Sequence, residues 1–156
     1  MDLKMAKKYF LRDDITYDFG LIAVHTVIEG FSLAYILNKT LKGKFKRSFS
    51  NEIINSANFE FFKWEIKKEN IDCSLISNQK KIKSKIKKSN TSLFFFEETK
   101  KVSLIDSLEN VDYFIKINSG LEINFVVEKI KSLPEIILSY IINNKKIKSK
   151  FNLIID

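Results

Sequence analysis

The chain has 156 residues, a formal net charge of +8, one proline and a single cysteine. A chain of this length buries enough surface to fold without a metal, and one cysteine forms no internal disulfide. No apolar run approaches the roughly 18 residues of a membrane span, and the first eight residues lack the apolar core of a secretion signal. We therefore expect one cytoplasmic domain over residues 1–156, with no membrane partner.

The first third predicts strand, helix and strand. Residues 3–12 alternate weakly and are expected to form an edge strand. Residues 19–28 are apolar on both faces, which is typical of a central strand covered on both sides. A helix pattern follows and stops at Gly43; its apolar face consists of Leu33, Ile36, Leu37 and Leu41. Residues 44–49 resume an extended pattern.

The middle third predicts an aromatic hairpin and a basic segment. Aromatic residues alternate along 59–66, the chain turns near 68–70, and residues 71–75 return, so a hairpin is expected within residues 58–78. Residues 80–90 contain no acid, and their self-repulsion predicts a mobile loop or an exposed strand end. Residues 79–104 are therefore expected to be a basic loop and connecting segment.

The last third repeats the first pattern. Residues 111–117 alternate as a strand, and residues 118–120 supply a turn and a cap. The next helix ends at Pro134; its apolar face consists of Ile123, Val126, Val127 and Ile130. Residues 136–142 form the following strand. Two strand–helix–strand units predict an α+β fold, a ferredoxin-like antiparallel sheet with both helices on one face, which the inserted aromatic hairpin widens.

One strand face in the last third is open to two interpretations. Asp112 and Lys116 flank Phe114 on the same side of the predicted strand. This pattern predicts either an open binding face or a solvated strand with one covered aromatic residue. The second interpretation is the simpler one.

Three runs hold most of the basic residues. They are Lys39, Lys42, Lys44, Lys46 and Arg47; Lys80, Lys81, Lys83, Lys85, Lys87 and Lys88; and Lys145, Lys146, Lys148 and Lys150. Charge gathered in this way makes a field that attracts nucleic acid or another polyanion. The candidate polyanion-binding residues are Lys44, Lys46, Arg47, Lys80, Lys81, Lys83, Lys85, Lys87, Lys88, Lys145, Lys146 and Lys148.

The opposing interpretation of the runs is a solvated surface. Only Arg12 and Arg47 are arginines, whereas nucleic-acid sites favour arginine because its planar fork pairs with phosphates and bases. Lysine, isoleucine, asparagine and phenylalanine are also what AT-rich codons produce. Both interpretations stay open at this point.

No catalytic constellation is evident. The only histidine, His25, falls mid-strand among apolar residues, where a structural role is expected. Cys73 has no second cysteine, which argues against zinc. Asp13, Asp14 and Asp18 are more typical of a charged turn than of a magnesium site, and no phosphate-binding loop is present. We expect a protein that is not an enzyme and that needs no metal or cofactor.

Residues 105–113 carry a short motif. Ile105 and the tripeptide Val111-Asp112-Tyr113 match the signature of the IPExxxVDY family, whereas Asp106 and Ser107 replace its proline and glutamate. The chain resembles this family of small Bacteroidetes proteins, which have no established function. The likeness extends over most of the chain and is poorest over 80–104; the other similar segments are 19–25, 33–39, 133–140 and 147–154.

The resemblance implies a cytoplasmic Bacteroidetes protein from an AT-rich genome. Genes of the similar proteins often lie near those of ribonuclease III and of fatty-acid synthesis, which implies an association with RNA or with acyl carrier protein. The resemblance assigns no residue a role.

Two functions are therefore expected. The first is a non-catalytic RNA- or ribosome-associated module, in which lysines contact phosphates and Phe62, Trp64 or Phe95 stack on bases. The second is an adaptor that docks on an acidic protein such as acyl carrier protein. In the adaptor the same lysines steer the partner, and residues 93–96 are buried against it.

Overall fold

The computed structural model describes residues 18–48, 59–87, 95–143, 145 and 147. The predicted strand over 3–12 and the acidic pair at 13 and 14 lie outside these ranges. The described helices are α2 (Gly30–Leu41) and α3 (Ile123–Lys131), with short 3-10 turns η1 (Lys67–Glu69) and η2 (Asp106–Leu108). The described strands are β1 (Gly20–Thr26), β2 (Lys46–Ser48), β3 (Phe61–Ile66), β4 (Ile71–Ser77), β5 (Gln79–Lys87), β6 (Phe95–Ser103), β7 (Tyr113–Ser119) and β8 (Ile136–Ile142).

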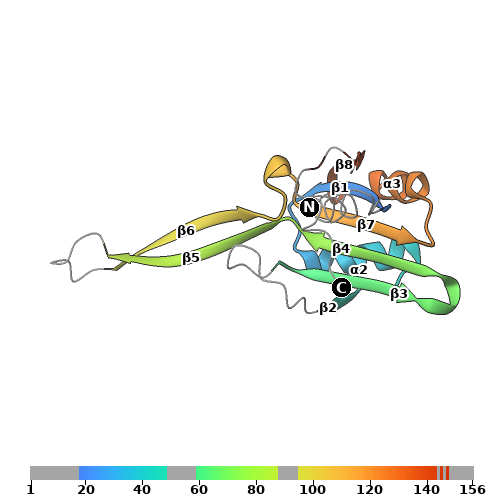
Figure 1. Cartoon of the computed structure of the whole chain (residues 1–156), viewed down its shortest axis with the longest axis horizontal. Helices are drawn as coiled ribbons and strands as arrows, with labels where there is room; N and C mark the ends of the chain where they lie inside the picture. The colour runs from blue at the N-terminus through green and yellow to red at the C-terminus, as the bar shows by residue number, and fades with distance from the viewer. Residues whose placement is uncertain (1–17, 49–58, 88–94, 144, 146, 148–156) are drawn as a thin grey trace, which may run out of the picture.

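Six strands form one antiparallel sheet in the order β2-β3-β4-β7-β1-β8 (Figure 1). β1 pairs with β7 on one side and with β8 on the other, so the strands predicted over residues 19–28, 111–117 and 136–142 share a sheet. The prediction of an α+β class with an antiparallel sheet is confirmed. The other two described strands, β5 and β6, pair with each other and form a two-stranded ribbon that projects away from the sheet.

The sheet is covered on both faces. Both helices pack on one face, where Leu33 and Leu37 of α2 and Val126 and Ile130 of α3 join one buried cluster. The opposite face is covered by a second cluster, to which the segment between β6 and β7 contributes Leu104, Ile105 and Val111. Alternate residues of β1 enter the two clusters, as expected for a strand that is apolar on both sides.

Helix α2 ends at Leu41, two residues before the predicted stop at Gly43. Its C-cap is Lys42, which takes the left-handed conformation at a φ of 52°. Gly43 follows and donates its backbone N–H to the Asn38 carbonyl at 2.9 Å. A Cβ at Gly43 would lie 3.0 Å from ring carbons of Trp64. A side chain at this position would crowd the indole, which packs against the backbone of Gly43.

Helix α3 agrees with its predicted bounds, but its cap differs. Glu122 is the N-cap, and its carboxylate accepts hydrogen bonds from the Asn124 and Phe125 N–H groups. The predicted cap at residues 118–120 is wrong. Asn118 and Ser119 end β7. The turn follows at Gly120, which has a φ of +88° and at which a Cβ would lie 2.7 Å from the Asn70 carbonyl oxygen.

The largest difference between the predicted and the observed elements concerns residues 79–104, which were expected to be a basic loop and connecting segment. Residues 79–87 and 95–103 are strands, paired antiparallel from Gln79 with Ser103 to Lys87 with Phe95. Alternation gathers Lys81, Lys83 and Lys85 on one face of β5. Part of their repulsion is offset because Lys85 lies opposite Glu97, and opposite charges across a pair stabilise it.

Candidate polyanion-binding site

The ribbon has one cationic face. Directly opposite residues of an antiparallel pair share a face, and the register places Lys81 opposite Lys101, Lys83 opposite Thr99 and Lys85 opposite Glu97. These four lysines are exposed. We call Lys81, Lys83, Lys85 and Lys101 the cationic face. The reverse face is mixed, with Ile82 opposite Lys100 and Ser84 opposite Glu98.

The foot of the ribbon is fixed by one buried side chain, Asn78. Its amide nitrogen donates to the carbonyls of Leu108 and Val111, each at 2.8 Å, and its amide oxygen accepts from the Ile105 N–H at 2.9 Å. Its backbone N–H donates to Asp112, and its carbonyl accepts from Leu104. These bonds join β5 to the segment that covers the sheet, so the ribbon leaves the domain in a defined direction.

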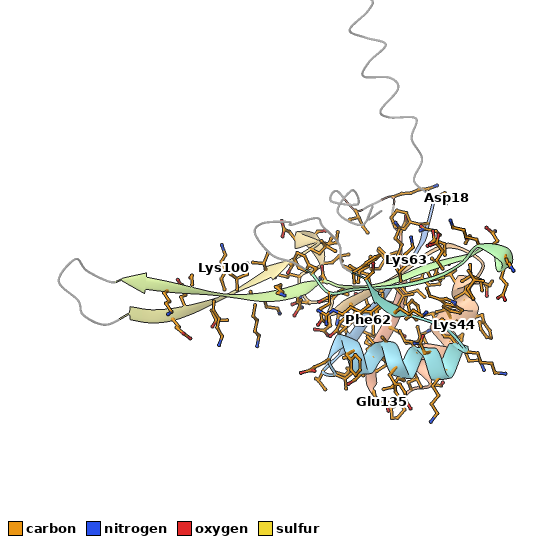
Figure 2. All side chains as sticks on the ribbon, turned by 90° about the horizontal axis from the view of Figure 1, so that it is seen from below. Asp18, Lys44, Phe62, Lys63, Lys100 and Glu135 are labelled. Carbon is orange, nitrogen blue, oxygen red and sulfur yellow. The ribbon has the colours of Figure 1, made fainter. Side chains whose placement is uncertain are left out.

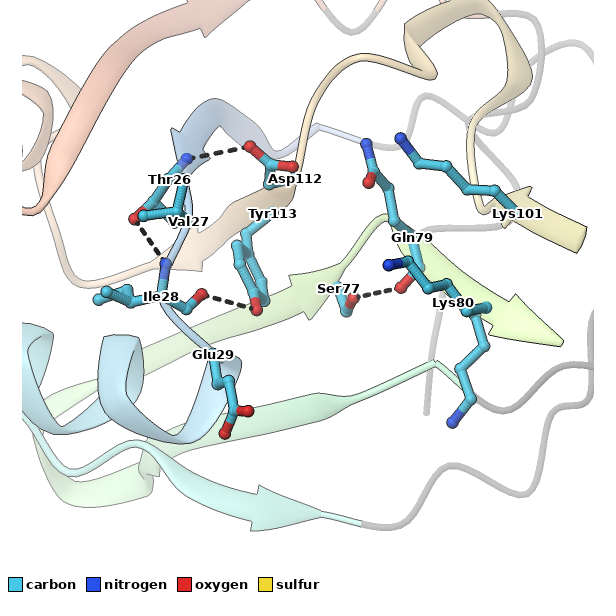
Figure 3. A pocket seen from close by; sticks show the side chains of 11 residues that line it. Thr26, Val27, Ile28, Glu29, Ser77, Gln79, Lys80, Lys101, Asp112 and Tyr113 are labelled. Carbon is cyan, nitrogen blue, oxygen red and sulfur yellow. Dashed lines mark hydrogen bonds between the residues drawn. The ribbon is translucent and has the colours of Figure 1, made fainter. Parts of the chain in front are cut away.

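A cavity of about 440 Å³ lies at this junction (Figure 3). Its volume is within the range of small-molecule sites. The ribbon contributes three lysines, and the other wall comes from the turn between β1 and α2 and from the start of β7. The lining residues are Thr26, Val27, Ile28, Glu29, Ser77, Gln79, Lys80, Lys81, Lys101, Asp112 and Tyr113.

The Asp112 and Tyr113 side chains hold that far wall in place. The Asp112 carboxylate accepts the Thr26 N–H at 3.0 Å, and the Tyr113 hydroxyl donates to the Ile28 carbonyl at 3.2 Å. Burial, followed by the carboxylates of Glu60, Asp112 and Glu29, raises the pKa of Tyr113 to about 12. The phenol is therefore a neutral donor at physiological pH. The matching motif residues thus build the turn that precedes α2.

A second cationic hollow of about 280 Å³ lies along the edge strand β2. It is lined by Lys44, Lys46, Arg47, Ser48, Lys63 and Glu65. Two ion pairs moderate its charge, since Arg47 lies 3.7 Å from a Glu60 oxygen and Lys63 lies 3.6 Å from a Glu65 oxygen. The first basic run is therefore gathered on one edge, but part of its charge is paired.

The structure brings together only some of the candidate lysines. Lys80 and Lys81 meet Lys101 at the junction, and Lys83 and Lys85 continue the cationic face. Lys145 is exposed after β8. The side chains of Lys87, Lys88, Lys146 and Lys148 lie outside the part of the chain that the structure describes. Lys63 and Lys101 were not among the candidate residues predicted from the sequence. Pairing residues 95–103 with residues 79–87 would have placed Lys101 beside Lys81.

The prediction that Phe62 and Trp64 stack on RNA bases is wrong. Phe62 and Trp64 are buried beneath the helices, so they offer no ring to a base. The side chain of Phe95 lies outside the described part. The aromatic residues of β3 belong to the core because both faces of this strand are covered.

The strand face around Phe114 is neither open nor solvated. Phe114 is fully buried and Lys116 is only 7% exposed. The Lys116 ammonium lies 5.0 Å from the centre of the Phe19 ring, an approach typical of a cation–π contact. Both interpretations drawn from the alternation are therefore wrong, because the segment before β7 covers this face.

His25 and Cys73, which were considered for catalysis, both lie in strands of the main sheet. His25 is the penultimate residue of β1 rather than a mid-strand residue, and its Nε2 lies 3.3 Å from the Tyr140 hydroxyl. Burial, and secondarily the Asp72 carboxylate, raises the pKa of Cys73 to about 12, so the thiolate needed for attack is scarce. Within the described ranges, no group of three or more histidine, cysteine or acidic side chains is placed to hold a metal.

None of the helices in the described residues is both long and apolar enough to cross a membrane. Comparison with protein-family models, with curated proteins and with solved structures finds no match to this chain.

Proposed function

We propose that this protein is a non-catalytic RNA- or ribosome-associated module that contacts the phosphate backbone through its cationic ribbon. The observation that carries the proposal is the alignment of Lys81, Lys83 and Lys85 on one face of β5, with Lys101 beside them on β6. Figure 2 shows lysine side chains along a ribbon that stands clear of the domain. A projecting ribbon reaches a nucleic acid without the rest of the protein in the way.

The spacing of the lysines suits a phosphate chain. Alternate side chains on a strand repeat every ~7 Å, about twice the ~3.4 Å axial spacing of charges along one strand of a duplex. Lysine contacts to phosphates position a nucleic acid without reading its sequence. We therefore expect RNA to be bound through its phosphate backbone with little sequence preference.

We also propose that the sheet has a ferredoxin-like topology, widened by an inserted aromatic hairpin. Two observations support it: β1, β7 and β8 lie side by side, and the adjacent pair β3–β4 separates β7 from β2. Membership of the IPExxxVDY family is proposed on the matching residues Ile105, Val111, Asp112 and Tyr113. Their burial and hydrogen bonds give each of them a structural reason to be kept.

Capture from a cell lysate of the source organism tests the proposed function. Immobilised wild-type protein is expected to retain RNA, and nuclease treatment is expected to release the proteins retained with it. The variant Lys83→Gln/Lys85→Gln removes two charges from the cationic face and should retain less RNA. Lys67→Gln/Lys68→Gln is the control, because these exposed lysines lie in η1 at the opposite end of the molecule.

A docking adaptor for an acidic protein such as acyl carrier protein is the second candidate. Phe31 and Tyr35 favour it, because they are 71% and 67% exposed and lie four residues apart on α2, where side chains are neighbours. Exposed aromatic residues of this kind anchor protein interfaces. Retention of one acidic protein that resists nuclease, together with no RNA, would favour the adaptor over the RNA module.

A further inference from the structure

The junction cavity holds a charge arrangement that folding alone does not favour. Lys81 and Lys101 lie directly opposite each other, and like charges in that relation destabilise a strand pair. Both line the cavity, as does Lys80, which the register places on the reverse face of the ribbon, opposite Val102. Among the described residues, the ion pairs of the structure involve other cations. An anion between the two opposed lysines would relieve their repulsion.

The cavity also closes one end of the cationic face. From Lys85 the face runs through Lys83 to Lys81, and there the ribbon meets the turn between β1 and α2. A nucleic-acid strand that follows the face toward the domain and ends in the cavity presents its terminal group, rather than an internal phosphodiester, to the opposed lysines.

The chemistry of the cavity matches a phosphorylated end. A phosphomonoester carries about −1.5 to −2 charge near pH 7 and presents three acceptor oxygens, whereas an internal phosphodiester carries a single charge. The wall also offers groups for the attached nucleoside. Val27 is 86% exposed and Ile28 lies beside it, which gives apolar surface for a base. Glu29, whose carboxylate does not cap α2, is an acceptor for ribose hydroxyls.

We propose that the junction cavity binds the terminal phosphomonoester of an RNA strand between Lys81 and Lys101, with the terminal nucleoside against the turn that precedes α2. The inference rests on the proposed function and deepens it, since it adds preference for a phosphorylated end to the sequence-independent contacts of the ribbon. The Asp112 carboxylate, which accepts the Thr26 N–H, also lines the cavity, so the opposed lysines must outweigh its negative charge.

Fluorescence anisotropy with matched oligonucleotides tests the inference. One RNA sequence is prepared with a 5′-phosphate, with a 3′-phosphate, and with hydroxyls at both ends, so that the two sources of a monoester are separated. We expect one phosphorylated form to bind about tenfold more tightly than the hydroxyl form, which corresponds to one added charge-assisted hydrogen bond.

Two neighbouring lysines supply the matched variants. Lys101→Gln removes a cavity ammonium, whereas Lys100→Gln makes the same charge change on the reverse face, opposite Ile82. Lys101→Gln should abolish the preference for the phosphorylated end, and Lys100→Gln should keep it. Both lysines are exposed, so neither change threatens folding.

Three results would overturn the inference. Equal affinity for all three RNAs in the wild-type protein would show that the ribbon binds internal phosphates only, and the proposed function would survive. A preference that persists equally in both variants would place the terminal phosphate elsewhere. Binding of none of the RNAs at low salt would remove the proposed function and this inference together.

Discussion

Lys81 of β5 lies directly opposite Lys101 of β6 at the foot of the ribbon. Replacing one of them by an acid converts a repulsive pair into an attractive one. We predict that Lys101→Glu stabilises the base of the ribbon by about 0.5 kcal/mol and weakens RNA binding. Amide hydrogen exchange of residues 79–83 and 99–103 reports the local stability, and anisotropy reports the binding.

The neighbouring lysine is the control for this change. Lys100 lies opposite Ile82, so Lys100→Glu gains no cross-strand ion pair. Its ribbon should exchange at the wild-type rate. Slower exchange in both variants, or in neither, would show that the two opposed lysines do not repel each other measurably.

Asn78 is predicted to be among the most sensitive polar positions of the domain. Truncation to alanine leaves the Leu108 and Val111 carbonyls and the Ile105 N–H without their side-chain partner. Unpaired buried groups are costly, so Asn78→Ala should lower the free energy of unfolding by about 3 kcal/mol. Urea denaturation followed by circular dichroism measures this loss.

An exposed asparagine provides the comparison for Asn78. Asn118 is exposed and makes one side-chain hydrogen bond, to Asp72. Asn118→Ala is therefore expected to change the free energy of unfolding by less than about 0.5 kcal/mol. If the two alanine variants were equally stable, Asn78 would not be the fixed point of the junction.

Stability is predicted to fall in alkaline solution. The pKa of the Cys73 thiol is raised from its ordinary value of 9.0 to about 12, and that of Tyr113 from 10.0 to about 12. Above pH 9 the unfolded chain releases these protons first, so the stability gained from both groups is complete below pH 9 and is lost as pH rises toward 12.

The contribution of Cys73 to this loss is separable. The urea midpoint of the wild-type protein should fall between about pH 8 and about pH 10.5, and the fall should be smaller in Cys73→Ala. The folded wild-type protein should also react slowly with a thiol reagent at about pH 8, because its thiol is buried and neutral. A fast reaction with the folded protein would contradict the burial of this side chain.

Much of the main sheet follows from the apolar pattern. Strands β1 and β8 were predicted from short apolar runs, whereas β7 and both helices were predicted because their apolar residues repeat with a clear period, which a buried face enforces. The helix caps were harder to predict. Glu122 caps α3 through a glutamate side chain, whereas the preferred N-cap types pointed to residues 118–120.

The ribbon was not predicted, although its signal is present. Lysines at 81, 83 and 85 alternate with Ile82 and Ser84, which is the period of a strand. The expected repulsion between the lysines outweighed this signal. The acids that face β5, Glu97 and Glu98, come later in the sequence, after residues 88–94, so their pairing with this strand is not visible in the local pattern. The cavity depends on the same long-range pairing, since Lys101 reaches Lys81 only through the register of β5 and β6.

Salt dependence of RNA binding tests the central claim most directly. Each phosphate that the protein neutralises in a single strand contributes about −0.7 to the slope of log affinity against log salt. Lys83→Gln/Lys85→Gln should therefore bind more weakly than the wild-type protein, with a slope shallower by about 1.4. Lys67→Gln/Lys68→Gln should keep nearly the wild-type slope. Equal slopes for the two double variants, or no wild-type binding at low salt, would contradict the account.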